Sequence, residues 1–394
     1  MRCWKSPHWY FLMAVTFLVF GANLYATITN QNAISNDYAA YSTFVSHMKS
    51  SGTITTPHFI YPLLVVIASV LVRFLSYSVL GAGIVLLFQL LLAHVLWKLF
   101  KQLLPAPVSD FIAIGLTVAA MTVAPINLLT VFKHNAYNGY IGITVYHNPP
   151  ISICRPIALV NVLLVAAALA GRRLSTRQTI LCFLTLALAA LMKPNYALIM
   201  LPTAALFAIL ALYRRDVLLL RFLCLGVLLP GLLVLAWQYA FTYVQPPANS
   251  DMDSASILFA PFLVYSTVAR FLIPKFFLSI LFPLGVLLLY RKEALQDRSY
   301  IIGLLLFLMG AAQSYLFAEG GIRMFKGNFL WSGQLGLFLW FVLSLAFVSK
   351  RFFAEPARTR WSTTYIILAG IFSLHVVSGM IWYYHETLTP GAFW

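Results

Sequence analysis

Apolar runs of about 20 residues recur along the whole chain, and this pattern constrains the fold more than any other feature. Hydrophobic residues make up 61% of the 394 residues, charged residues only 9%, and the mean hydropathy is +0.88. A soluble core cannot use that much apolar surface. In lipid every backbone amide must be bonded within the chain, so runs of this length form helices. They lack the alternation of a membrane β-barrel, and the sequence therefore predicts an all-α polytopic bundle.

The basic residues predict how the chain crosses the membrane. The net charge of +16 is concentrated at helix ends, as the positive-inside rule expects, so it does not indicate a nucleic-acid partner. If every basic cluster is cytoplasmic, an even number of crossings separates each pair. External loops are then expected at 132–155, between the apolar segments 109–131 and 156–171, at 244–270 and 318–329, and at the Lys193-Pro194 turn. The clusters are the N-terminus (Arg2, Lys5), 98–101, 172–177, 214–221, 291–298 and 350–360.

One interval breaks this parity. Three apolar runs, 9–28, 58–74 and 77–97, lie between the N-terminus and the cluster at 98–101. Either 58–74 is re-entrant or interfacial, or the positive-inside rule fails at that cluster. The first run is long and lacks a cleavage site, so we expect a retained helix and not a signal peptide. We predict about 11 to 12 membrane helices in one transmembrane domain over 1–394, with no separate soluble domain.

The expected external loops hold the ionisable residues that helix-end chemistry does not explain. Asp37 and Glu319 are the two acids in otherwise apolar or aromatic surroundings. Basic residues on this face oppose the positive-inside bias, and ionisable groups at the membrane edge are candidates for function. Their charge calls for an anionic partner. The candidate binding residues are Lys193, Arg323, Arg155, Lys133, His147, His58, Asn148, Lys326 and Asn328.

Each of these residues also has an ordinary structural interpretation. Lys193 could extend its amine to the lipid headgroups, and His147 could be a solvated loop residue. Arg323 and Glu319, four residues apart, could form a structural ion pair. Asp37 could cap the short helix that follows it. The occurrence of such residues in four separate loops favours a common site over four unrelated explanations.

The residue types suit a lipid-linked phosphate. Arginine offers phosphate a bidentate fork and lysine a point charge. A single carboxylate can act as general base on an acceptor hydroxyl, while the cations stabilise a leaving phosphate. This chemistry requires no metal or other cofactor. A divalent metal stays an open alternative without support, because no group of His, Cys, Asp or Glu has the spacing of metal ligands. The four cysteines, Cys3, Cys154, Cys182 and Cys224, are scattered.

Several short stretches resemble the GT-C superfamily of membrane glycosyltransferases. An acid in the first external loop is followed by a short amphipathic stretch and then TPHFIYPLL. HNPPISICRPIAL, LMKPNYALIMLP and EGGIRMFKGNFLWSG are similar to bacterial polyprenyl-phosphate-mannose-dependent mannosyltransferases of this class. The resemblance implies a GT-C-like bundle with short amphipathic helices on its external face. It also implies that Asp37 is the catalytic base and that Lys193 lies near the donor phosphate. Many members carry paired acids where this chain has Asn36-Asp37.

These observations predict an inverting glycosyltransferase, specifically a hexosyltransferase of glycolipid biosynthesis in the cell envelope. It would be a multi-pass protein of the bacterial inner membrane, with a cytoplasmic N-terminus and a site on the periplasmic or extracellular side. Its partners would be a polyprenyl-phosphate sugar donor, a lipid or glycan acceptor and membrane lipids. Asp37 would be the base, and Glu319 would orient Arg323 or act as a second acid.

Two alternatives stay open. A lipid-linked oligosaccharide polymerase or ligase also gathers Arg and His around a lipid pyrophosphate, although usually on one large late loop. A transporter or flippase of lipid-linked sugars would need polar residues along a path across the bilayer. The apolar runs offer only scattered ones, namely Gln89, His94, Gln238, Gln313 and His375.

Overall fold

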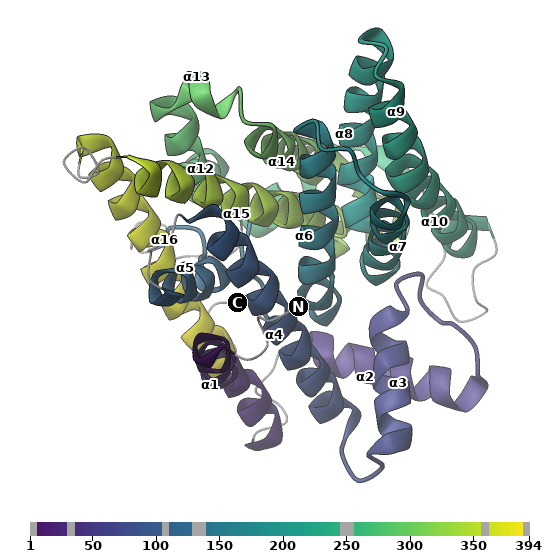
Figure 1. Cartoon of the computed structure of the whole chain (residues 1–394). Coiled ribbons are helices and arrows are strands. Elements are labelled where there is room, and N and C mark those ends of the chain that lie inside the picture. The colour runs from purple at the N-terminus through teal and green to yellow at the C-terminus, as the bar shows by residue number, and fades with distance from the viewer. Residues whose placement is uncertain are drawn as a thin grey trace.

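The computed structural model is a bundle of helices (Figure 1). It describes residues 6–29, 36–104, 110–127, 139–244, 256–355 and 362–388. In these ranges the only strands are β1 (Ile257–Phe259) and β2 (Phe317–Glu319), which form one antiparallel pair. The predicted all-α polytopic bundle is confirmed.

The helices have the following bounds in chain order. The first part of the chain forms α1 (Pro7–Thr29), α2 (Asn36–Ser51), α3 (Ile60–Leu71), α4 (Tyr77–Leu103), α5 (Asp110–Thr122), α6 (Pro149–Leu169), α7 (Thr176–Met192) and α8 (Pro194–Tyr213). The rest forms α9 (Val217–Leu223), the π-helix η3 (Cys224–Leu228), α10 (Leu229–Tyr239), the π-helix η4 (Ala240–Val244), α11 (Leu263–Val268), α12 (Leu272–Leu289), α13 (Arg291–Ala294), α14 (Arg298–Leu316), the 3₁₀-helix η5 (Gly321–Lys326), α15 (Leu330–Ala354) and α16 (Thr363–Leu388).

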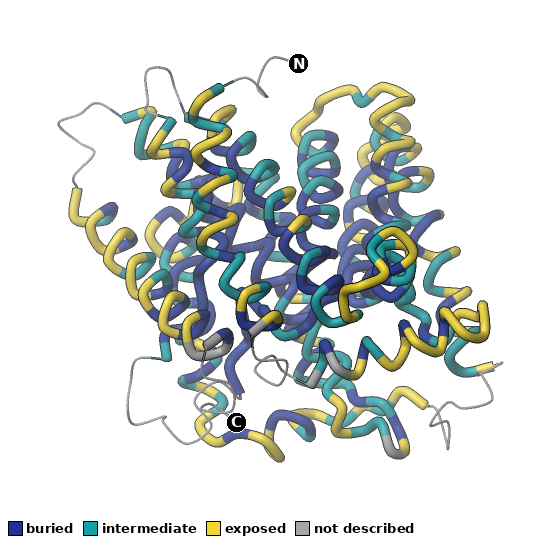
Figure 2. Tube along the Cα trace, turned by 90° about the horizontal axis from the view of Figure 1, so that it is seen from below, coloured by how far each residue is buried: buried dark blue, intermediate teal, exposed yellow. Residues whose placement is uncertain are grey.

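The surface of the bundle is that of a protein surrounded by lipid. Among the described residues, nine helical stretches are long and apolar enough to cross a bilayer. Their outward faces expose large apolar side chains, such as Leu18, Ile273 and Leu288. Figure 2 shows exposed residues along the outer helices and buried ones in the middle. Lipid solvates such a surface, whereas in water it would drive aggregation. The chain is a multi-pass membrane protein.

The short helix α3 bears on the parity of the crossings. It has 12 residues, which span only about 18 Å at 1.5 Å per residue. The hydrocarbon core of a bilayer is about 30 Å thick. Both α2 and α3 pack on α4, and Figure 1 shows the two lying together at one end of the bundle. Its length favours a re-entrant or interfacial α3, with α1 and α4 as the crossings before Lys98.

The expected apolar segment at 109–131 and the helix after it have different limits from those predicted. α5 ends at Thr122, and residues 128–138 lie outside the described ranges. α6 begins at Pro149, well before the apolar run at 156–171, because Asn148 caps it. The Asn148 Oδ1 accepts a hydrogen bond from the Ile151 amide at 3.2 Å, and prolines occupy the first turn.

The helices α14 and α15 pack closely because glycines line their contact. A Cβ on Gly310 would lie 2.3 Å from the Ser332 carbonyl oxygen, and one on Gly336 would lie 2.6 Å from that of Leu306. Small residues of this kind let two membrane helices bring their backbones together. The segment 317–329, which joins these helices, is therefore held at both ends by a tightly packed pair.

Candidate functional site

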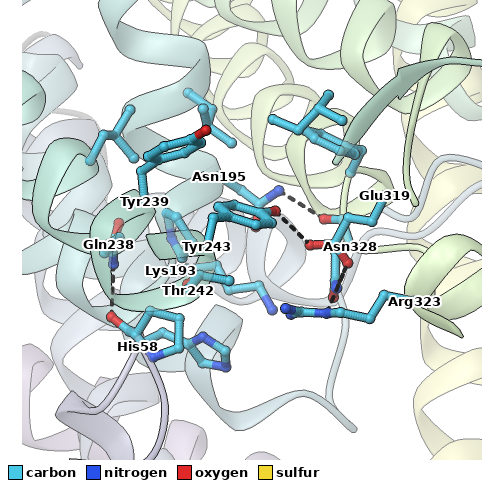
Figure 3. Close-up of a pocket in the computed structure, with 16 residues that line it drawn as sticks. His58, Lys193, Asn195, Gln238, Tyr239, Thr242, Tyr243, Glu319, Arg323 and Asn328 are labelled. Carbon is cyan, nitrogen blue, oxygen red and sulfur yellow. Dashed lines mark hydrogen bonds and ion pairs between the residues drawn. The ribbon is translucent and has the colours of Figure 1, made fainter. Parts of the chain in front are cut away.

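A polar cavity of about 330 Å³ lies where four distant segments of the chain meet. These segments are the start of α3, the α7–α8 turn, the end of α10 with η4, and the β2–α15 connection. Figure 3 shows the labelled side chains arranged around the cavity. The residues that line it are Pro57, His58, Lys193, Pro194, Asn195, Leu198, Leu235, Gln238, Tyr239, Thr242, Tyr243, Ile257, Glu319, Arg323, Asn328 and Phe329.

The restriction that Pro194 imposes on the backbone of Lys193 directs the lysine side chain into this cavity. A residue before proline is pushed out of the helical region, and Lys193 is accordingly extended, with φ −153° and ψ 110°. Its amide donates to the Ala189 carbonyl and closes α7, while Pro194 starts α8. The side chain thus leaves the chain between two helices, and Figure 3 shows it pointing toward Arg323.

The Lys193 amine is buried without an opposing charge at contact distance. The residue is 5% exposed, and its Nζ lies 4.7 Å from the centroid of the Trp331 ring. Among the described residues, no side chain or carbonyl forms a hydrogen bond or ion pair with this amine. Burial lowers the pKa of Lys193 from 10.5 to about 8, although the charges of Asp37 and Glu319 partly oppose the shift. Because a snorkelling amine would reach the headgroups, this burial argues against that interpretation.

Glu319 holds the second cation in place. Its Oε2 lies 3.3 Å from the Arg323 Nε and accepts a short hydrogen bond from the Asn328 amide, while Oε1 accepts one from the Tyr243 hydroxyl at 3.2 Å. Within the described part of the chain, nothing hydrogen-bonds to the terminal Nη atoms of Arg323. The carboxylate therefore orients Arg323 by its Nε and leaves the guanidinium fork directed at the cavity.

His58 contributes an uncharged imidazole. Burial and, to a smaller extent, the positive charges of Lys193 and Arg323 lower its pKa from 6.5 to about 3. Its Nε2 lies 2.9 Å from the Tyr41 hydroxyl, whose pKa is raised by burial and by the nearby Asp37. His58 is thus able to offer a hydrogen bond to an anion, but not a charge.

Two amide side chains tie these segments together. Asn195 donates to the Asn328 carbonyl at 2.9 Å and to the Ser332 hydroxyl at 2.8 Å, which joins the α7–α8 turn to the β2–α15 connection. Gln238 donates to the carbonyls of Pro57 and Ala190, each at 2.9 Å. These bonds fix the spacing between Lys193 and the groups across the cavity. Pre-organised binding groups of this kind need little rearrangement when a ligand arrives.

Asp37 lies at the edge of this arrangement and does not line the cavity. It belongs to the first turn of α2, and its Oδ2 accepts a hydrogen bond from the Asn148 amide at 2.8 Å. Among the charged groups that raise the pKa of Lys193, Asp37 has the largest effect. Asn148 positions this carboxylate from the start of α6. The α2 and α6 ends therefore bring a carboxylate within electrostatic range of Lys193.

Other predicted binding residues lie elsewhere. Arg155 is 2% exposed and packs inside the bundle, where its guanidinium donates to the Ile143 and Val145 carbonyls and lies 5.1 Å from the Phe338 ring. It does not line the cavity. The expectation that it holds the donor phosphate gains no support from this position, because its charge is directed at backbone oxygens.

The remaining predicted residues lie near or beyond the cavity. The His147 ring lies 5.8 Å from the Trp331 ring, which also contacts the Lys193 amine. Trp331 therefore lies between His147 and Lys193. Lys326 is exposed at the end of η5 and does not line the cavity. Lys133 lies outside the described residues.

The helix run 217–244 supplies cavity residues that were not predicted. Gln238, Thr242 and Tyr243 line the cavity, although Gln238 reads in the sequence as an isolated polar residue. Gln238 and Thr242 are four positions apart and so share a helix face, and Tyr243, which follows Thr242 in the wider turn of η4, lines the cavity beside them. In the sequence, these polar residues at helical spacing within an otherwise apolar run were the signal that could have identified this part of the cavity. The π-helix η4 carries two of them, and such segments are frequent at functional sites.

The chain matches no protein-family model and no curated protein. The site must therefore be interpreted from its own chemistry. In the described ranges, no three His, Cys, Asp or Glu side chains gather in a way that could hold a metal ion. The arrangement offers instead two cations, a neutral imidazole, several amides and a neighbouring carboxylate. This set can bind a phosphate and present a base beside it.

Proposed function

We propose that this protein is an inverting glycosyltransferase that uses a polyprenyl-phosphate sugar. The observation that carries the proposal is the pair formed by Lys193 and Arg323. They come from segments 130 positions apart, point toward each other in one cavity, and have terminal nitrogens that no described carboxylate engages. A phosphate between them would give these terminal nitrogens an anionic partner.

The change in charge during the reaction explains why the site would need two cations. The acceptor hydroxyl attacks the anomeric carbon of the sugar as the bond from that carbon to the phosphate oxygen breaks. The donor phosphodiester carries one negative charge, and the leaving polyprenyl phosphate carries a second. Lys193 and Arg323 stabilise this added charge more strongly than they stabilise the ground state, which is the condition for acceleration.

Asp37 takes the proton of the acceptor hydroxyl. Its position outside the cavity lining, within electrostatic range of Lys193 and held by Asn148, suits an acceptor that approaches from the α2 side. Glu319 has all its described bonds directed at Arg323, Asn328 and Tyr243, which favours the orienting role over a second acid. The charge distribution among the loops favours a cavity on the periplasmic or extracellular face of a bacterial inner membrane.

The test is Asp37→Asn, compared with Asp216→Asn as a matched control. Asp216 caps α9 at the other end of the bundle, where its Oδ1 accepts from the Leu219 amide at 3.0 Å. Membranes would receive a radiolabelled polyprenyl-phosphate mannose, and both donor binding and label in glycolipid or glycan products would be measured. Asp37→Asn should keep donor binding and lose transfer by at least about a hundredfold, the usual effect of removing a general base. Asp216→Asn should transfer normally.

Three results would contradict the proposal. Near-normal transfer in Asp37→Asn would remove this residue as the base. Turnover only with a lipid diphosphate oligosaccharide would favour a polymerase or ligase. Movement of the lipid-linked sugar across liposomes without a covalent product would favour a transporter.

A further inference from the structure

A second, smaller cleft lies at the opposite end of α8 and α14 from the polar cavity. It has a volume of about 100 Å³. α8 has 20 residues and so separates the two sites by about 30 Å, the thickness of the hydrocarbon core. The two cavities therefore lie near the two faces of the membrane. The residues that line the cleft are Ala168, Leu169, Gly171, Phe207, Leu210, Ala211, Arg214, Asp216, Leu219 and Arg298.

Two arginines give this cleft its charge. Arg214 caps the C-terminal end of α8, and Arg298 begins α14. No described residue forms an ion pair or a side-chain hydrogen bond with either guanidinium. Asp216, the acid of the cleft, uses its Oδ1 to cap α9 and forms no salt bridge with either arginine. Two guanidinium groups in one small cleft make a recognition site for an oxyanion, since each can donate a pair of parallel hydrogen bonds.

The surroundings of the cleft favour an anion that belongs to a lipid. Its walls are mostly alanine, leucine and phenylalanine. On the outer surface beside Arg214, three large side chains are strongly exposed, namely Leu212 (64%), Tyr213 (86%) and Val217 (70%). Such side chains are solvated by acyl chains, so a phosphate in the cleft would have its hydrocarbon tails alongside α8 and α9. Basic clefts between membrane helices on the cytoplasmic side bind lipid headgroups in this way.

We propose that the cleft between α6, α8, α9 and α14 binds the phosphate of an anionic phospholipid from the leaflet opposite the polar cavity. Arg214 and Arg298 hold the phosphate, and the apolar surface of α8 and α9 contacts the acyl chains. This site does not depend on the glycosyltransferase proposal, because it shares no residue with the polar cavity. A bound lipid would join the ends of four transmembrane elements and so stabilise the bundle.

The experiment uses the full chain purified in detergent, with phosphatidylglycerol and phosphatidylcholine supplied at equal concentration. Native mass spectrometry counts the retained lipids, and thermal unfolding reports stability. Arg214→Gln/Arg298→Gln removes both guanidinium groups. The matched control is Arg291→Gln/Lys292→Gln, which removes the same charge from exposed positions of α13 outside the cleft.

We expect the wild-type chain and the control to retain one phosphatidylglycerol in preference to phosphatidylcholine. The double arginine variant should bind phosphatidylglycerol about tenfold more weakly and lose its stabilisation by that lipid. If this variant does not fold, Arg214→Lys/Arg298→Lys keeps both charges and should still show a weaker preference, because lysine lacks the fork.

Equal losses in the cleft variant and the control would mean nonspecific attraction to surface charge, and would overturn the proposal. A further arm adds inorganic phosphate without lipid. Stabilisation of the wild type by phosphate to the same extent as by phosphatidylglycerol would refute the assignment to a lipid. Retention of one phosphatidylglycerol in the presence of phosphate would support it.

Discussion

Raising the pH from 7 to 9 should weaken the binding of a polyprenyl-phosphate sugar about tenfold. The pKa of Lys193 is about 8, lowered from 10.5 chiefly by burial. If only the ammonium form binds the donor phosphate, the apparent dissociation constant scales as one plus the ratio of neutral to charged amine. That factor is about 1.1 at pH 7 and about 11 at pH 9. A lysine of ordinary pKa would remain charged throughout this interval, and binding would then change little.

His58 and Tyr41 do not change charge in this interval. The pKa of His58 is about 3, so the imidazole is neutral, and the raised pKa of Tyr41 keeps its hydroxyl protonated. Arginine stays charged as well. The phosphodiester of the donor carries one negative charge over the whole range. The profile therefore reports on Lys193.

The assay is equilibrium binding of polyprenyl-phosphate mannose to the purified chain in detergent, measured by thermophoresis at half-unit steps of pH. Lys193→Arg is the control, because a guanidinium keeps its charge at pH 9 and the profile should become flat. Lys193→Gln should bind weakly at every pH. A flat wild-type profile, or one that Lys193→Arg reproduces, would show that the charge of Lys193 does not hold the ligand.

Two further perturbations test other parts of the site. Glu319→Gln should weaken donor binding by about tenfold, because the neutral amide no longer orients Arg323 by an ion pair, and unchanged affinity in a titration would contradict this role. Gly336→Ala should destabilise the chain by about 1–3 kcal/mol, since the new Cβ would meet the α14 backbone. Gly115→Ala, where a Cβ meets nothing within 4 Å, is its control and should not lower the melting temperature.

The sequence predicts the helices well where hydropathy decides them, and less well at their ends. α6 begins seven residues before its predicted apolar run, because the Asn148 cap and two prolines start the helix ahead of the continuous hydrophobic stretch. α3 is too short to cross, although its composition is that of a membrane span. Hydropathy reports which environment suits a helix and not whether the helix is long enough to cross. α3 exposes the apolar side chains of Ile67, Val70 and Leu71 as a membrane span would.

The structure brings only some of the predicted site residues together. The structure brings Lys193, His58, Glu319, Arg323 and Asn328 into one cavity, whereas Arg155 lies inside the bundle. An arginine near a helix start reads the same in sequence whether its partners are a ligand or backbone carbonyls. Only tertiary packing, which brings the carbonyls at 143 and 145 to Arg155, distinguishes these cases. Packing likewise brings the polar face of the 217–244 helix to the cavity.

The terminal nitrogens of Lys193 and Arg323 have a practical consequence for purification. They point toward each other across the polar cavity, and Glu319 contacts Arg323 only at its Nε, so an amphiphile with a phosphate or sulfate head would relieve the remaining repulsion. Preparations in detergent should therefore contain a scavenged head group at this position, taken from the host membrane or from an anionic detergent. Density between these two side chains in an experimental map should therefore be assigned first to a co-purified lipid or detergent head group, and only then to a substrate.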